Sequence, residues 1–490
     1  MTRRSLWLLG AAALALLGSR FITMAVLPMS DTTEPRYAEI ARLMAVSGDW
    51  ITPWFEPGVP FLGKPPLSFW AQALAIKLFG LSDFAPRLPA WVASFGIVAL
   101  TARLGWHLGG GYLAVTGALV LSSMALVWIA AGAVMTDAFL VFGTTLSLVA
   151  FVLSASGGAA PIWRWLFFCG ISIGLLAKGP LAVVLVGLPI LVWSVWNLRW
   201  RSWWTVLPWI RGSMLTAALV LPWYILAELK TPGFLGYFVM GEHFGRFITP
   251  GWAGDLYGNA HDEPRGMIWV FLVWASFPWG LVGAVLLLRA LSGCEGRRMA
   301  RSWLERPEHG LIIAAALTTP MFFTLAGNIL WTYLLPALPF LALMIALGLR
   351  KTSPVALLAG ACAVPIGVTA FAVHLALTPA TLKSEVALLS AFKAQRDNPE
   401  ARLHYVGNLP HSARYYGGGE VAQTSADGLA ELMAATAPGQ IFLAVRNDHL
   451  QSLATQLGDA EELFRGRRYT LLRVPLPTNP DLDVTPTTGD

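Results

Sequence analysis

Long apolar runs dominate the first three quarters of the chain and alternate with short polar stretches. Each run has roughly the 20 residues that an α-helix needs to cross a bilayer. The pattern therefore predicts an all-α polytopic membrane bundle of about 11–13 transmembrane helices. The runs occupy residues 6–29, 84–106, 112–131, 134–153, 163–177, 180–198, 206–227, 267–288, 309–326, 329–349 and 355–377.

The pattern changes after residue 378, where short segments rich in β-branched, leucine and aromatic residues alternate with short helical ones. Such alternation predicts a C-terminal α/β domain over residues 379–475. Residues 476–490 are rich in Pro, Thr and Asp and predict a flexible tail. The predicted strands are residues 403–406, 441–445 and 469–474, and the predicted short helices are residues 429–435 and 448–457.

Two long loops interrupt the membrane domain, which we assign to residues 1–378: residues 30–83 and 228–266. In the first loop, apolar residues recur at a spacing of three and four from Arg36 to Val46, which predicts an amphipathic helix along the membrane surface. Pro65 and Pro66 open a second helix over residues 67–78. The apolar positions of the first helix are Tyr37, Ile40, Ala41 and Met44.

Composition and charge support a membrane protein. Hydrophobic residues make up 56% of the 490 residues and charged residues 13%, about half the charged fraction of soluble domains. With the N-terminus in the cytoplasm, most basic residues of the membrane region fall in the short loops on that side. We therefore attribute the net charge of +6 to these loops, and not to nucleic-acid binding. The same orientation predicts a multi-pass protein of a bacterial inner membrane with its C-terminal domain in the periplasm.

Charged and polar side chains gather on the predicted outer face. Asp31 and Glu34 lie at the start of the first surface helix, and Lys64 lies just before the second. Charges beside a membrane are costly unless they pair or have a function. Cations can hold a phosphate, and a carboxylate can accept a proton, so the cluster predicts a site for an anionic, lipid-linked substrate. The same face receives Asp137, Lys178, Glu242, His243, Arg246, Asn328 and Tyr333.

Short motifs follow one another in a characteristic order along roughly the first 350 residues. They are Thr33-Glu34-Pro35-Arg36-Tyr37, Ser47-Gly48-Asp49-Trp50, Lys64-Pro65-Pro66-Leu67, Phe84-Ala85-Pro86-Arg87, Thr136-Asp137, Ala177-Lys178-Gly179-Pro180, Glu242-His243-Phe244-Gly245-Arg246 and Thr332-Tyr333-Leu334-Leu335-Pro336. In this set and order the chain resembles the GT-C class of integral-membrane glycosyltransferases. It is most similar to the group that contains bacterial aminoarabinose transferases and protein O-mannosyltransferases.

The resemblance implies a polyprenyl-phosphate sugar as donor, undecaprenyl phosphate in the bacterial branch, with inversion at the transferred sugar. The acceptor would be lipid A or another cell-envelope glycolipid, and in the mannosyltransferase branch a protein hydroxyl. Matching positions imply that Lys64 and Arg246 contact the donor phosphate, with Arg36 and Tyr333 beside them. The catalytic carboxylates would be Asp31 or Glu34, together with Asp137, and the further site candidates are Tyr37, Lys178 and His243.

Two positions depart from the family pattern. Many relatives carry an Asp directly before the Glu of the first motif, where this chain has Thr33. The nearest Asp is Asp31, which we favour over Glu34 as the key carboxylate. Several relatives carry a metal-binding Glu before Lys-Pro-Pro, where this chain has Gly63. That leaves His243 without its expected partner and argues against a divalent metal.

Two alternative hypotheses, from functional classes other than enzymes, also account for these residues. A transporter or flippase of lipid-linked sugars would hold the phosphate without chemistry, and a scaffold would bind partners through the C-terminal domain. Transporters often contain internal repeats and charges near the middle of the membrane. This chain has no clear repeat, and its polar residues gather at one interface, which favours the enzyme.

Overall fold

The computed structural model describes residues 2–156, 160–197, 202–258, 261, 263–293, 298, 306–378, 381–436 and 439–476. Two compact units make up the chain. The first contains Met1–Ala25 and Ile40–Phe371, and the second contains Val26–Glu39 and Ala372–Asp490. The short segment before the first surface helix thus belongs with the C-terminal domain. The predicted flexible tail lies outside the described residues, apart from its first position.

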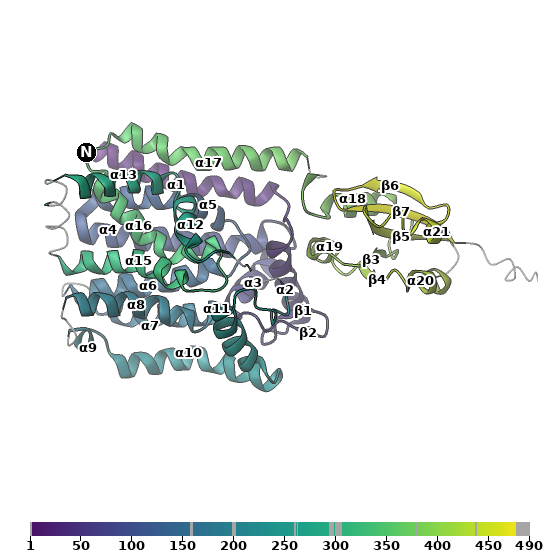
Figure 1. Ribbon diagram of the computed structural model, residues 1–490, viewed down its shortest axis with the longest axis horizontal. Helices are drawn as coiled ribbons and strands as arrows, with labels where there is room; N and C mark the ends of the chain where they lie inside the picture. Colours follow the sequence, from purple (N-terminus) through teal and green to yellow (C-terminus); the bar gives the residue numbers. More distant parts are fainter. Residues whose placement is uncertain are drawn as a thin grey trace, which may run out of the picture. The chain divides into compact units, whose positions relative to one another are not determined.

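The first unit is a helical bundle built from the apolar runs (Figure 1). Helix α6 packs between α4 and α7, and α15 packs against α8 and α16. The helices up to residue 377 are α1 (Arg3–Val26), α2 (Thr33–Ser47), α3 (Leu67–Phe79), η1 (Ala85–Arg87), α4 (Leu88–Ser122), α5 (Ala125–Ala130), α6 (Asp137–Ala155), α7 (Ile162–Lys178), α8 (Leu181–Trp196), α9 (Ser202–Val206), α10 (Trp209–Lys230), η2 (Gly236–Gly245), α11 (Arg246–Ile248), α12 (Met267–Ala275), α13 (Trp279–Ser292), α15 (Pro307–Thr324), η3 (Trp331–Ala337), α16 (Leu338–Gly348) and α17 (Pro354–Leu377).

Among the described residues, six helices are long and apolar enough to cross a membrane, or seven if one bent pair counts as a span. The predicted number is larger because five of the eleven runs do not appear as separate helices in this set. Two of the five are α7 and α15, which have 17 and 18 residues. Helix α4 counts as one span there, although non-helical backbone at Gly109 and Gly110 divides it between the two predicted runs, 84–106 and 112–131. Helices α12 and α13 form one pair bent by 111°. Helix α8 has only 16 residues, although it is apolar throughout.

The two helices predicted in the first long loop are both present. Helix α2 buries Ile40, Ala41 and Met44 completely, as expected for the apolar face of an amphipathic helix. Helix α3 begins at Leu67, directly after Pro65 and Pro66. Between the two helices lies a small antiparallel hairpin of β1 (Trp54–Glu56) and β2 (Val59–Pro60).

The second unit contains a five-stranded mixed sheet in the order β4-β3-β5-β7-β6. The predicted α/β domain is thereby confirmed, and its three predicted strands are the inner ones. The edge strands β4 and β6 were missed because edge strands are partly exposed and carry more polar residues. The elements are α18 (Val386–Gln395), β3 (Leu403–Val406), α19 (His411–Gly417), β4 (Val421–Thr424), α20 (Leu429–Ala435), β5 (Gly439–Arg446), α21 (Ala454–Leu457), β6 (Glu461–Arg465) and β7 (Tyr469–Leu476).

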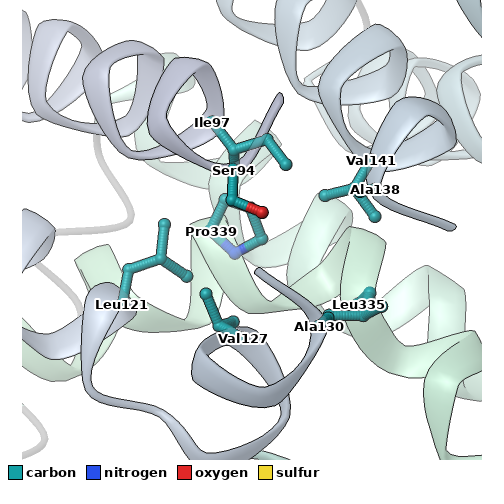
Figure 2. A pocket seen from close by; sticks show the side chains of 9 residues that line it. All are labelled: Ser94, Ile97, Leu121, Val127, Ala130, Ala138, Val141, Leu335 and Pro339. Atoms are coloured by element: carbon teal, nitrogen blue, oxygen red, sulfur yellow. The ribbon is translucent and has the colours of Figure 1, made fainter. Parts of the chain in front are cut away.

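A small apolar cavity lies in the core of the first unit, beside the start of α6 (Figure 2). Its volume of about 20 Å³ is close to that of a single water molecule. The hydroxyl of Ser94 points to this region but already donates to the carbonyl of Ala90. We therefore regard the cavity as a packing gap. Its lining residues are Ser94, Ile97, Leu121, Val127, Ala130, Ala138, Val141, Leu335 and Pro339.

Candidate active site

Two of the predicted phosphate-binding cations meet in the first unit at a single carboxylate. The Lys64 Nζ lies 2.7 Å from Glu242 Oε2, and Arg246 NH1 lies 3.4 Å from the same oxygen. Arg246 NH1 also lies 3.3 Å from Asp255 Oδ2. The two cations are exposed by 18% and 17%, whereas Glu242 is exposed by only 4%. Solvent therefore reaches the cations, while the carboxylate that joins them is almost fully covered.

Local backbone structure brings these side chains together. Lys64 lies in the short link before α3, and its ammonium also donates to the carbonyl of Gly63. Glu242 lies on η2, a π-helix that leads directly into Arg246 at the start of α11. π-Helical turns are rare and often occur at functional sites. The ring of Trp252 covers Gly241 and Gly245 so closely that a Cβ at either position would lie 2.9–3.0 Å from it, so both positions favour glycine.

The cluster keeps Glu242 ionised. Burial alone would raise the pKa of Glu242, but the neighbouring Lys64 and Arg246 hold the pKa below its ordinary value. The Tyr237 hydroxyl donates to Glu242 Oε1 at 3.3 Å, and burial raises the pKa of this phenol. The tyrosine therefore stays a neutral hydrogen-bond donor.

A second group of predicted site residues also comes together. Asp137, the first residue of α6, accepts a hydrogen bond from Lys178 Nζ over 2.7 Å. The same ammonium lies 5.4 Å from the centre of the Tyr333 ring. Both charged side chains are mostly covered, at 11% and 13% exposure. A buried ion pair with a cation–π contact holds its geometry firmly, because breaking either contact leaves a charge uncompensated.

His243 links the two groups. Its Nε2 lies 3.0 Å from the carbonyl oxygen of Lys178, and its Nδ1 lies 2.8 Å from that of Phe238. Burial lowers the pKa of His243, although the two carbonyl oxygens act in the opposite direction. The neutral ring carries one N–H and can donate to one carbonyl at a time.

The geometry of His243 does not fit a metal ligand. Both ring nitrogens already face backbone carbonyl oxygens, and Gly63 supplies no carboxylate. Within the described part of the chain, no three His, Cys, Asp or Glu side chains are grouped as metal ligands.

Gly179 is a sensitive position next to this histidine. It ends α7 with a φ of +70°, and an added Cβ would lie 2.5 Å from Phe238 and 3.3 Å from His243. We expect Gly179→Ala to lower the stability of the first unit by at least about 2 kcal/mol, because backbone strain and overpacking add. Thermal unfolding in detergent measures the change.

The matched control for this prediction is Gly233→Ala. Gly233 has a φ of +91° but no atom within 4 Å of an added Cβ. It therefore carries the same kind of backbone strain without the clash. Equal losses of stability in both variants would contradict the role that we assign to the packing of Phe238 and His243 against Gly179.

Asp31, the favoured carboxylate, lies in the second unit and is bound by residues of the C-terminal domain. Its Oδ1 accepts the backbone N–H of Ser412 at 2.8 Å. Its Oδ2 accepts the Ser412 hydroxyl at 2.7 Å and the Arg468 guanidinium at 2.5 Å. The Asp31 side chain is only 1% exposed. Arg468 also binds Glu385, whose pKa burial raises.

The other predicted residues of the first motif lie at the start of α2. Glu34 is in the first turn of that helix and is partly exposed. The helix dipole stabilises a carboxylate at this position. The Arg36 guanidinium lies over the ring of Tyr37, 5.1 Å from its centre. Burial, and then the charge of Arg36, lower the pKa of His411 in the same unit to about 4. His411 is therefore neutral near pH 7.

Three residues of the first cluster received no role from the sequence. Glu242 belongs to a recognised motif, and its spacing of four residues before Arg246 on a helix could have indicated a pair. Tyr237 and Asp255 have no such signal, because their contacts with the cluster depend on how the loop after α10 folds back.

The chain is similar in sequence to known transferases. Residues 10–238 match the model of the dolichyl-phosphate-mannose-protein mannosyltransferase family. The chain is 31% identical to the undecaprenyl phosphate-alpha-4-amino-4-deoxy-L-arabinose arabinosyl transferase of Pseudomonas aeruginosa (strain UCBPP-PA14) over 360 residues, 70% of this chain and 59% of that protein. The corresponding protein of Aeromonas salmonicida is 30% identical over 334 residues, 65% of this chain and 56% of that one.

Solved structures show the same fold. The crystal structure of ArnT from Cupriavidus metallidurans bound to undecaprenyl phosphate superposes with a TM-score of 0.79 at 17% identity, covering 96% of this chain and 98% of that one. The apo form of ArnT gives a TM-score of 0.74 at 18% identity, covering 95% and 97%. The predicted helical membrane fold with a C-terminal α/β domain is confirmed, apart from the number of spans. The chain spans less than two thirds of the length of the two curated relatives above.

Proposed function

We propose that this aminoarabinose transferase-like protein of the GT-C class moves a sugar from an undecaprenyl-phosphate donor to an acceptor in the cell envelope, such as lipid A or another glycolipid. The observation that carries the proposal is the pair of solvent-reached cations, Lys64 and Arg246, held at one buried carboxylate. Two fixed cations at a membrane protein's polar face suit the phosphate of a lipid-linked sugar. The similarity to undecaprenyl phosphate-alpha-4-amino-4-deoxy-L-arabinose arabinosyl transferases supports the donor.

The proposed reaction is a displacement at the anomeric carbon. An acceptor oxygen forms a new bond to that carbon, and the bond from carbon to the phosphate oxygen breaks. The electron pair stays on the phosphate, which leaves as undecaprenyl phosphate. Lys64 and Arg246 stabilise the charge that grows on this leaving group. If the acceptor carries a proton, it passes to a carboxylate.

Asp137 is the carboxylate that we assign to the acceptor. It lies in the same unit as the cations, and its partner Lys178 contacts His243, the neighbour of Glu242 in sequence. Both oxygens of Asp31 are engaged by Ser412 and Arg468, so we assign Asp31 to positioning the segment that carries Glu34 and Arg36. Glu34 stays the second candidate base, because its side chain is partly exposed at the start of α2.

An apolar cavity offers room for the lipid part of the donor. It has a volume of about 500 Å³ and lies between α7, α8 and α10. On α7 it reaches from Phe167 to Leu175, three residues before Lys178. An isoprenoid chain is entirely apolar, so burial in such a cavity is favourable. We place the reaction on the periplasmic face of the inner membrane, with the N-terminus in the cytoplasm, because basic residues concentrate in the opposite loops.

A protein hydroxyl is the second candidate acceptor, because residues 10–238 match a protein mannosyltransferase family. The experiment uses the purified protein in nanodiscs with a panel of undecaprenyl-phosphate sugars, supplied with either lipid A or Ser/Thr-containing peptides. Release of undecaprenyl phosphate with a sugar-sized mass gain on lipid A supports the proposal. A mass gain on the peptides alone supports the second candidate. Tight binding without release from any donor supports a transporter and contradicts both.

A further inference from the structure

Glu242 stands between the two cations of the proposed mechanism and has no role in bond making. One of its oxygens contacts both cations, at 2.7 Å from Lys64 and 3.4 Å from Arg246. Its other oxygen accepts the Tyr237 hydroxyl at 3.3 Å. Such a carboxylate is an internal competitor for any phosphate that binds the same cations.

Carboxylates lie beside both cations. Lys64 and Arg246 supply two positive charges, and Glu242 and Asp255 supply two negative ones. The carboxylate of Glu242 is far less exposed than the two cations, so an incoming anion meets the cations first and finds Glu242 behind them. A phosphate at this site is attracted by the cations and repelled by the carboxylates.

This repulsion depends on the charge of the ligand. The donor is a phosphodiester with one negative charge, whereas the product is a phosphate monoester with about 1.5 to 2 negative charges at pH 7. A fixed carboxylate therefore disfavours the product more strongly than the donor. The same two cations can stabilise the leaving group during the reaction and still release it afterwards.

We propose that Glu242 is an internal counter-anion that weakens the hold of Lys64 and Arg246 on the polyprenyl phosphate product and so speeds its release. The inference rests on the proposed function and makes Glu242 a positioning residue that acts through the two cations. Glu242 would then raise kcat by speeding product release, and it would not improve binding of the donor.

The test compares Glu242→Gln with the wild-type protein in nanodiscs, with undecaprenyl phosphate as the product inhibitor. We expect the inhibition constant of undecaprenyl phosphate to fall by about tenfold or more. The donor KM should fall by a smaller factor and kcat should also fall, because release becomes slow. The control is Glu263→Gln, which removes the same charge at a partly exposed side chain of the loop over residues 228–266 and should leave the inhibition constant unchanged.

Two more variants keep the test decisive. Glu242→Asp retains the charge and should keep the ratio of inhibition constant to KM close to wild type. Asp255→Asn removes the other carboxylate at Arg246 and should tighten product binding in the same direction, even if Glu242→Gln does not fold. An inhibition constant that is unchanged or raised in folded Glu242→Gln, or equally tightened in Glu242→Asp, overturns the inference. A wild-type protein that neither binds undecaprenyl phosphate nor transfers a sugar overturns the proposed function itself.

Discussion

Replacing Lys64 with methionine is expected to lower kcat/KM for sugar transfer by at least about 100-fold, the usual effect of removing one group that stabilises developing charge. Lys64 is one of two cations at the shared carboxylate, so its loss removes one of the two positive charges that face Glu242. Glu242 then offsets more of the remaining positive charge, and the attraction for the donor phosphate is weaker. Methionine keeps most of the length of the side chain, so packing changes little.

Steady-state kinetics with the preferred donor and a direct measurement of the Kd for undecaprenyl phosphate check this prediction together. The matched control is Lys77→Met, which removes an exposed ammonium that lies over Trp50 near the end of α3. This control should keep normal kinetics. A Lys64→Met protein that folds and binds undecaprenyl phosphate with an unchanged Kd would remove Lys64 from the phosphate site.

The helices of the site were predictable because their signals are local. Pro65 and Pro66 mark the start of α3, and the spacing of Ile40, Ala41 and Met44 marks the buried face of α2. The number of spans was not predictable to the same degree. Whether the backbone breaks at Gly109 and Gly110, and by how much it bends between α12 and α13, are features of backbone geometry that a hydropathy pattern does not contain.

The pairing of the site residues could be predicted only in part. A shared membrane face suggested that Asp137, Lys178 and Tyr333 gather, and the structure supplies the partners. Glu242 is the buried carboxylate that contacts both Lys64 and Arg246. A single sequence does not reveal that its side chain is buried. For Asp31, the decisive contact comes from Arg468, 437 residues further along the chain. A local motif could not distinguish a catalytic carboxylate from one that binds a distant arginine.

The second prediction with a large effect follows from this contact. We expect Asp31→Ala to destabilise the second unit by about 3–5 kcal/mol, the cost of breaking a buried ion pair by removing one partner. In this variant Arg468 would pair with Glu385 and no longer with residue 31, and the backbone N–H of Ser412 would lose its acceptor. Hydrogen exchange of amides in β3 and β5, measured on the full-length protein, reports the loss of stability in that unit.

Partner variants separate an anchoring role of Asp31 from a catalytic one. If Asp31 anchors its segment, Arg468→Gln and Ser412→Ala should weaken the same amide protection, because each removes a bond to the same carboxylate. Asp448→Ala breaks an exposed pair with Arg446 in the same unit and should leave protection nearly unchanged. If Asp31 is instead the base, Asp31→Asn would abolish transfer with wild-type protection, and Arg468→Gln would retain activity. That result would return Asp31 to the reaction and leave Asp137 as the second acidic position.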